Sequence, residues 1–420
     1  MERSSFRRKV FCGVHWAEDH HDVAIIDTDG TLMAKARISD DAAGLAHLLA
    51  LLAEHGDNPD EQIPVAIETS RGLLVACLRA TGRRVFAINP LAVARYRQRH
   101  SVARKKNDQA DAAALANILR TDIQAHRPLP ADSELAQAVA VLARAQQDAV
   151  WDRTQAHNKL RSQLREYFPA FLAAFADKRE GIMRPEARVI LATAPTPAQA
   201  ARLTRARLTT LLKKAGRMRG IAAEADRLHA VFHAQQMRHP PQVEQAFGRQ
   251  ALALLRTLEA TCINADELEQ AATETFARHP DAPVITSFPG LGMLTAARAL
   301  AEIGDDRTRF ADAKALKAYA GAAPVTRSSG KSHHVMHRKI KNQRLAAVGY
   351  LWSFAALTAS PGARAHYDRR RAGNERHVAA QRNLFNRLLG MLHHCLQNDT
   401  PYNEALAFPT ATTTAPAPTT

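Results

Sequence analysis

Residues 9–39 read KVFCGVHWAEDHHDVAIIDTDGTLMAKARIS and decide the fold expected for the first part of the chain. This stretch holds three apolar segments, at about 9–16, 22–27 and 31–38, that are rich in β-branched residues. Asp29 and Gly30 separate the last two segments, and an Asp-Gly pair between apolar runs is typical of a tight hairpin turn. The stretch therefore predicts an antiparallel meander of three strands.

The segments that follow this meander alternate between strand and helix. Apolar strand patterns cover 63–68 and 84–88, and helical patterns cover about 41–54, 70–81, 90–99 and 108–120. Such alternation predicts a mixed sheet that is covered by helices. Three hairpin strands followed by two strand–helix units resemble the element order of a ribonuclease H-like (RuvC-like) domain, which we expect over residues 9–125.

The rest of the chain is expected to be mainly helical, so the predicted fold class is α/β plus all-α. From about 133 to 279, Ala, Leu, Arg, Glu and Gln recur at helical spacing. This predicts a helical or coiled-coil region over 130–280, with chain-to-chain pairing as its expected role. A small, mainly helical C-terminal domain is expected over 281–400, and the Thr-, Pro- and Ala-rich residues 408–420 predict a disordered tail.

Composition favours a protein that binds a polyanion. The 420 residues include 57 Lys and Arg against 41 Asp and Glu, a formal net charge of +16, and 46% are hydrophobic. An excess of positive charge attracts phosphate backbones. No run approaches the roughly 20 apolar residues of a membrane span, and the N-terminus has no apolar signal core, so we expect a cytoplasmic, nucleoid-associated protein. The cysteines, widely separated with no CxxC spacing, predict neither a zinc site nor a disulfide framework.

Three acidic residues are candidate metal ligands. Glu68 ends a predicted strand near the middle of the sheet, and Asp108 and Asp111 lie three residues apart at the start of a helix, so that both project from one face. Carboxylates grouped in this way suit Mg²⁺, which completes its shell with waters and phosphate oxygens. Helix capping is the alternative for each aspartate, and turn punctuation is the alternative for Glu68.

Two basic segments are candidate nucleic-acid contacts. One precedes the aspartates and the other lies in the last third of the chain. Their members are Arg95, Arg97, Arg99, Arg104, Lys105 and Lys106 in the first, and Arg327, Lys331, Arg338, Lys339, Lys341 and Arg344 in the second. Cations beside an acidic cluster would lead a phosphate backbone towards it, and a solvated surface is the alternative.

Ser328 and Ser329 precede Gly330 in a loop within the second basic segment. A serine hydroxyl is a weak nucleophile and needs a base, a metal or cations that stabilise the developing charge. The segment supplies the cations, but Ser-Ser-Gly is also an ordinary turn. In the same third of the chain, Gly290 and Gly292 precede a helix, which fits either a phosphate-binding loop or a simple turn.

The motifs GVHWAEDHHDVAIID, IETSRG, KKNDQADAAALA, FPGLGMLTAARALAEIGD and LKAYAGAAPVTRSSGKS occur in this order along the chain. Together they resemble the insertion-sequence-110 family of transposases, the bridge-RNA-guided serine recombinases with a DEDD-type acidic domain. The resemblance implies a RuvC-like domain in which Asp, Glu, Asp and Asp bind Mg²⁺, with Mn²⁺ as an alternative. The second, third and fourth acids carry over as Glu68, Asp108 and Asp111.

The same resemblance implies a catalytic serine, which carries over as Ser329 with Ser328 as the adjacent alternative. This serine would form a covalent phosphoserine link to DNA and conserve bond energy for strand exchange. A structured noncoding bridge RNA would select donor and target DNA, and the working complex would be a homo-oligomer, a dimer or a tetramer.

The chain departs from the family pattern at its first acid, where histidine occupies position 15. Imidazole can bind a metal but is a poorer partner for Mg²⁺ than a carboxylate. Three hypotheses follow: His15 is a working ligand, one of Glu18, Asp19 and Asp22 replaces the missing acid, or the copy is impaired.

Two other functions are alternatives to a recombinase. The protein would then be a hydrolytic nuclease or junction resolvase, or a non-catalytic nucleic-acid-binding protein.

Overall fold

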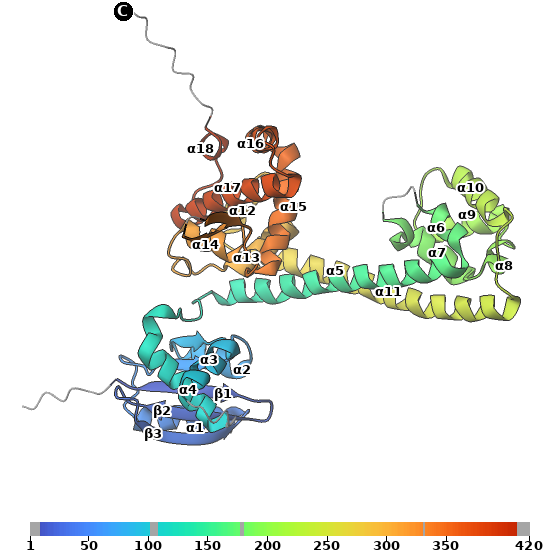
Figure 1. The fold of residues 1–420 in the computed structure, drawn as a ribbon. Coiled ribbons are helices and arrows are strands. Elements are labelled where there is room, and N and C mark those ends of the chain that lie inside the picture. Colours follow the sequence, from blue (N-terminus) through green and yellow to red (C-terminus); the bar gives the residue numbers. More distant parts are fainter. Residues whose placement is uncertain (1–8, 101–107, 177–179, 331, 410–420) are drawn as a thin grey trace, which may run out of the picture. The chain divides into compact units, whose positions relative to one another are not determined.

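The computed structural model describes residues 9–100, 108–176, 180–330 and 332–409. The chain divides into two compact units, residues 1–131 and 132–420 (Figure 1). Arg104, Lys105, Lys106 and Lys331 of the predicted nucleic-acid contacts lie outside the described residues. Residues 410–420 of the predicted tail also lie outside them.

The first unit contains a five-stranded mixed sheet, which confirms the predicted α/β class of this part. Its strands are β1 (Phe11–Trp16), β2 (His20–Ile26), β3 (Leu32–Ser39), β4 (Val65–Ile67) and β5 (Val85–Ala87). They lie in the order β3-β2-β1-β4-β5. β1 pairs antiparallel with β2, and β2 with β3, whereas β4 is parallel to both β1 and β5. The central strand β1 therefore ends at the same sheet edge as β4.

Successive residues of each strand point to opposite faces of the sheet, and apolar side chains lie on both faces. Helices cover each of these apolar faces. On one face, α1 (Ala42–Glu54) and α2 (Leu73–Ala80) pack over Cys12 and Val14 of β1. On the other face, α3 (Pro90–His100) and α4 (Asp108–Asp122) pack over Phe11, Ala66 and Phe86. A short 3₁₀ helix, η1 (Ile123–Ala125), follows α4.

Gly13 allows α4 to lie directly on β1. A Cβ atom at this position would fall 2.1 Å from the carbonyl oxygen of Ala112 and 2.5 Å from the amide nitrogen of Ala116. Both atoms belong to the backbone of α4, so any side chain at position 13 would push the helix away from the strand. The glycine thus fixes how closely the first turns of α4 approach the end of β1.

The second unit begins with a long antiparallel helix pair, α5 (Glu134–Tyr167) and α11 (Pro241–Ala277) (Figure 1). The described part of the predicted helical middle contains helices joined by turns and no strand, and the pairing in the structure is between two helices of one chain. Short helices close its far end around a core that includes Phe168, Phe171 and Phe232. They are α6 (Pro169–Ala174), η2 (Gly181–Met183), α7 (Pro185–Thr193), α8 (Pro197–Ala200), α9 (Arg205–Lys214) and α10 (Ile221–His233).

The other end of the helix pair joins a second, separate core around Phe288, Trp352 and Phe385. Its helices are α12 (Ala282–Thr286), α13 (Met293–Ile303), α14 (Ala313–Tyr319), α15 (Gln343–Ala359), α16 (Pro361–Ala372), α17 (His377–Asn398) and α18 (Glu404–Ala407). A two-stranded hairpin, β6 (Val325–Ser329) and β7 (Ser332–Met336), interrupts the helices. Phe408, the first residue of the predicted tail, is buried in this core.

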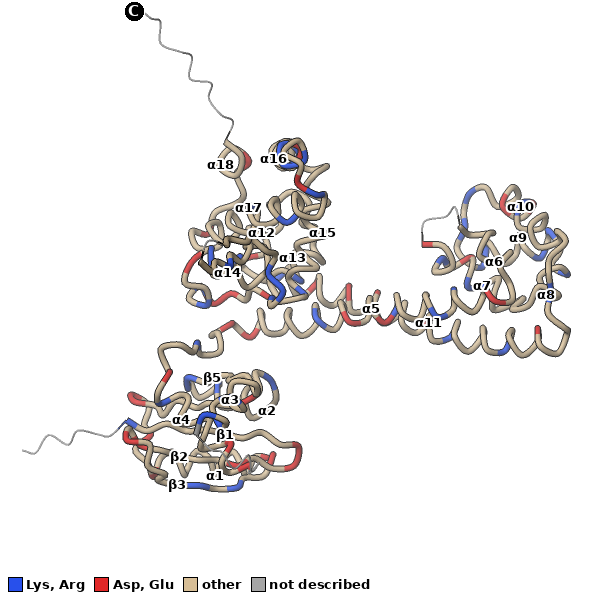
Figure 2. The backbone as a smooth tube through the Cα atoms, in the orientation of Figure 1, with Lys and Arg blue, Asp and Glu red and all other residues tan. Residues whose placement is uncertain are grey.

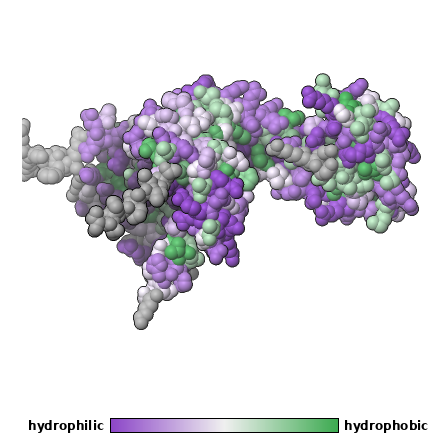
Figure 3. Space-filling model, turned by 90° about the horizontal axis from the view of Figure 1, so that it is seen from above, coloured by the Kyte–Doolittle hydropathy of each residue, from purple (hydrophilic) through white to green (hydrophobic). Residues whose placement is uncertain are grey.

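Charged residues are distributed over the surface of both units. Figure 2 shows Lys and Arg in the sheet unit and in the helical unit, including α16, whose last turn carries three arginines. Hydrophilic and hydrophobic residues are intermixed over the face that Figure 3 presents. In the described ranges, no helix combines the length and the apolar character that a membrane span needs.

Candidate functional site

The sheet edge at the end of β1 brings four predicted ligands together. His15 is the penultimate residue of β1, and Glu68 directly follows the parallel strand β4. The residues before them, Val14 and Ile67, are partners in the parallel register. The His15 Nδ1 atom lies 3.1 Å from Glu68 Oε2, and its Nε2 atom lies 3.5 Å from Asp108 Oδ1. One ligand atom each of His15, Asp108 and Asp111 lies within 4.8 Å of the others. The structure thus groups an imidazole with three carboxylates.

Helix α4 supplies both aspartates from its first turn. Asp111 is only 1% exposed, whereas the Asp108 side chain is 46% exposed. The burial of Asp111 follows from the close packing of α4 on β1 at Gly13. A carboxylate is rarely buried unless it is paired with a cation. Asp111 has such a partner in Arg97 of α3, whose Nη1 atom donates to both carboxylate oxygens at 2.6 and 2.7 Å.

A second ion pair borders the cluster. Asp22 of β2 lies directly across from His15 in the β1–β2 register, so both side chains point to the same face of the sheet. Arg37 of β3 holds the buried Asp22 carboxylate with two hydrogen bonds of 3.2 and 3.0 Å. Of the three acids considered as replacements at position 15, Asp22 is therefore adjacent to the cluster, while Glu18 and Asp19 are exposed in the β1–β2 turn.

The imidazole of His15 is held without a hydrogen bond at its buried nitrogen. Nδ1 is close to Glu68 but is not aligned for hydrogen bonding, and it has no hydrogen-bond partner within the described part of the chain. A buried ring nitrogen usually has a partner, because leaving it unpaired costs free energy. Nδ1 therefore faces the Glu68 carboxylate at 3.1 Å with its hydrogen-bonding capacity unused.

Ser328 and Ser329 lie on a β-strand rather than in the loop expected from sequence. They end β6, and Ser328 pairs with His333 while Ser329 pairs with Ser332. Paired residues share a face, so the two hydroxyls point to opposite faces of the hairpin. Ser329 shares its face with Arg327, two residues before it. The turn at Gly330, where φ is +56°, and both serines are exposed to solvent.

The described basic residues fall into two groups. Exposed or partly exposed cations without a hydrogen-bond or ion-pair partner in the described ranges are Arg95, Arg99, Arg327, Arg338, Lys339 and Lys341. Arg97 and Arg344 are instead engaged within the protein. Arg344 binds both carboxylate oxygens of Asp148 at 2.8 Å and stacks over the Trp151 ring. Either arginine would have to release its carboxylate, Asp111 for Arg97 and Asp148 for Arg344, before it could contact DNA.

Two transposase family models match the chain. The DEDD-type IS110 domain, described as a transposase, matches residues 12–169, and a model described as the transposase IS116/IS110/IS902 family matches residues 282–368. A mini-circle putative transposase for IS117 from Streptomyces coelicolor is 62% identical over 95% of this chain and 96% of that relative. An uncharacterized 42 kDa protein of insertion element IS900 from Mycobacterium paratuberculosis is 29% identical over 97% and 99%.

The chain belongs to the IS110 family of transposases. The first matched region of this transposase contains the acidic cluster, and the second contains the serine hairpin. Its DEDD-type domain belongs to a class that typically uses a divalent metal, and a transposase acts on DNA. The family predicted from the motif order is therefore confirmed.

Sequence reasoning missed the residues that shape the acidic cluster. Arg97 was read as a phosphate contact, and its pairing with Asp111 was not predicted, because the approach of α3 to α4 depends on tertiary packing. Asp22 was one of three acids considered as a replacement at position 15, and strand alternation with a hairpin register would have singled it out as the one beside His15. Gly13, a glycine inside an apolar strand, was the available signal for a close approach of another backbone.

Gly290 has a packing role that favours the simple turn over a phosphate loop. Its φ is +80°, and a Cβ atom there would lie 2.6 Å from the amide nitrogen of Ala356 in α15.

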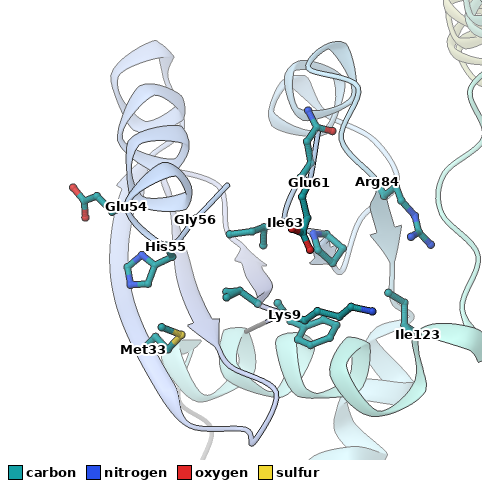
Figure 4. A pocket seen from close by; sticks show the side chains of 13 residues that line it. Lys9, Met33, Glu54, His55, Gly56, Glu61, Ile63, Arg84 and Ile123 are labelled. Atoms are coloured by element: carbon teal, nitrogen blue, oxygen red, sulfur yellow. The ribbon is translucent and has the colours of Figure 1, made fainter. Parts of the chain in front are cut away.

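The first unit of the transposase also has a pocket of about 680 Å³ at the opposite end of β1 from His15 (Figure 4). Lys9, Glu61 and Arg84 are among its lining residues, and it contains no member of the acidic cluster.

Proposed function

We propose that this transposase cuts and rejoins DNA through a covalent link between Ser329 and a backbone phosphate, with a divalent cation held at the acidic cluster. The observation that carries the proposal is the convergence of His15, Glu68, Asp108 and Asp111 at one sheet edge in a chain whose family acts on DNA. The strand order β3-β2-β1-β4-β5 supports assigning the first unit to the ribonuclease H-like, RuvC-like class.

The donor atoms at the cluster suit a divalent cation. Asp108 and Asp111 supply hard carboxylate oxygens, and the His15 Nε2 atom, which lies 3.5 Å from Asp108 Oδ1, adds a softer ligand. Carboxylates favour Mg²⁺, while an imidazole in the set makes Mn²⁺ the better-matched alternative. When bound, such an ion lowers the cost of negative charge on the phosphate and on the leaving oxygen. Glu68 would position the His15 ring through Nδ1.

Ser329 would supply the nucleophile. A new bond forms between its Oγ atom and the DNA phosphorus, the bond from phosphorus to one strand oxygen breaks, and that oxygen takes up a proton while the serine gives up its own. Arg327 lies on the same face of the hairpin and would stabilise the charge that develops on the phosphate. Ser328 faces His333 instead, and is the alternative nucleophile with a nearby base.

Guidance and assembly form part of the same proposal. The family resemblance supports a structured noncoding bridge RNA that selects donor and target DNA by base pairing. It also supports a homo-oligomer, a dimer or tetramer, in which the acidic cluster of one chain meets the serine hairpin of another. The exposed position of the hairpin is compatible with such an encounter.

A denaturing-gel assay tests the chemistry. Purified protein with the RNA from its element is incubated with labelled DNA and Mg²⁺, and a protein–DNA adduct that survives denaturation is expected. Ser329→Ala should abolish the adduct, while Ser332→Ala, the partner of Ser329 in the hairpin, serves as the matched control and should retain it. Loss in Ser328→Ala alone would move the nucleophile to Ser328. Cleavage without an adduct would favour a hydrolytic nuclease, and binding without cleavage would favour a non-catalytic protein.

Substitutions at position 15 test the metal site. His15→Asp should tighten Mg²⁺ binding by roughly tenfold or more, because a carboxylate replaces a neutral ring, and His15→Ala should weaken it. Isothermal titration with Mg²⁺ and with Mn²⁺ measures both effects without requiring activity. If His15→Ala forms the adduct as well as the wild type, His15 is not a required ligand, and Asp22 becomes the acid to replace next.

A further inference from the structure

A second pocket, of about 360 Å³, opens in the C-terminal part of the helical unit. It lies between the turn after α14, the first half of α15 and the start of α17. The chain segment that follows β7 forms one wall, through His337 and Lys341. This segment leads out of the hairpin that carries Ser329, but neither Ser328 nor Ser329 lines the pocket. Its volume falls within the range of small-molecule sites.

Gln381 makes this pocket unusual. The residue lines the pocket and is only 2% exposed, yet its Nε2 and Oε1 atoms both lack a hydrogen-bond partner in the described ranges. A buried amide with neither donor nor acceptor satisfied is costly, and native proteins tolerate few such groups. A ligand that offers an acceptor beside a donor would satisfy both atoms at once.

The remaining lining residues add positive charge and an aromatic ring. His337, Lys341 and Arg382 have no hydrogen-bond or ion-pair partner among the residues that the structure describes, and no acidic residue lines the pocket. The Tyr350 ring is 54% exposed at the pocket, while Phe385 is buried within it. Cations that are not neutralised by the protein favour an anionic ligand, and an exposed ring offers a stacking surface.

We propose that this pocket holds one unpaired nucleobase of a DNA strand, with the adjacent phosphate on the basic side chains. A base edge presents a donor beside an acceptor, which matches the Gln381 amide, and adenine is a known partner for a glutamine side chain. Tyr350 would stack on the base. A purely anionic ligand, such as a carboxylate, would satisfy Nε2 but leave Oε1 without a donor. This inference rests on the proposed function, because it assumes that the protein handles DNA.

The test compares two labelled DNA duplexes, one fully paired and one with a single unpaired adenine, by fluorescence anisotropy at one fixed salt concentration. The full-length wild-type protein should bind the duplex with the unpaired adenine roughly fivefold to a hundredfold more tightly. Gln381→Leu should abolish this preference while leaving affinity for the paired duplex within about twofold, since phosphate contacts dominate non-specific binding. Gln163→Leu, at a buried glutamine of α5, is the matched control and should keep the preference.

Tyr350→Ala provides a second variant at an exposed position, in case Gln381→Leu lowers stability, and should also reduce the preference. Equal binding of both duplexes by the wild type would overturn the proposal even if the Ser329 adduct forms, and would mean that water satisfies the Gln381 amide. A preference found only with the corresponding RNA duplexes would overturn the assignment to DNA. Failure to bind either DNA would overturn both this proposal and the proposed function.

Discussion

Replacing Gly13 with alanine should displace helix α4 and weaken the acidic cluster. The added Cβ atom would lie 2.1 Å from the Ala112 carbonyl oxygen, whereas such contacts are essentially never under 3.0 Å, so the helix must retreat by about 0.9 Å. Because the obstacle is helix backbone, no side chain can rotate away, and we expect a loss of about 3 kcal/mol in the stability of the first unit. Asp111 would move with the helix.

Hydrogen exchange followed by mass spectrometry measures this effect, because peptides from β1 and α4 report the first unit separately. Exchange in α4 should become faster by roughly two orders of magnitude, the factor that corresponds to about 3 kcal/mol. A displacement near 1 Å should also lower adduct formation by about a hundredfold. Gly292→Ala is the matched control, because nothing lies within 4 Å of a Cβ atom there. Wild-type exchange in α4 of the Gly13 variant would refute the packing argument.

Three further predictions concern charge. Arg97→Gln should tighten Mg²⁺ binding by roughly tenfold in isothermal titration, because the guanidinium competes for Asp111; weaker binding would mean that Arg97 positions the carboxylate instead. Burial raises the pKa of Cys12 to about 12, so iodoacetamide at pH 8 should label the partly exposed Cys77 and spare Cys12, and equal labelling would contradict this. Burial opposes ionisation of Glu244, but hydrogen bonds from Arg238 and a backbone amide outweigh this effect and lower the pKa of the carboxyl group. The ionised group therefore stabilises the fold fully at pH values above 4.5, the ordinary pKa of a glutamate. That contribution is lost as the pH falls through the lower folded value, and Glu244→Gln should flatten the acid dependence of hydrogen exchange in α11.

The sheet could be predicted because its signals are local. The Asp29-Gly30 turn joins two apolar segments, and the alternation of strands and helices after it yields the mixed sheet that the structure contains. The start of α4 at Asp108 is equally local, since two aspartates in a first turn suit the helix dipole. Together with the expected element order, these signals predict that Glu68, Asp108 and Asp111 lie close together.

The remaining features depend on contacts between segments that are distant in sequence. Arg97 and Arg344 look alike in the sequence, as members of basic runs, but tertiary packing binds one to Asp111 and the other to Asp148. The serine hairpin was not predicted, because strands rich in Ser, His and Arg lack an apolar pattern. The unpaired amide of Gln381 is equally invisible, because on α17 it is one polar residue within a helical pattern.

The antiparallel pair α5–α11 also bears on how the second unit unfolds. A helix of 34 residues is about 51 Å long, and the two hydrophobic cores occupy its opposite ends without sharing a residue. Between them the buried positions of the pair are mostly small or polar, such as Ala149 and Gln146, so the middle buries little apolar surface. Two parts of a protein unfold together when they share buried apolar surface, and these two cores share little of it. Calorimetry should therefore resolve two heat-absorption peaks for this unit, because the far-end helices unfold independently of the core beside the hairpin.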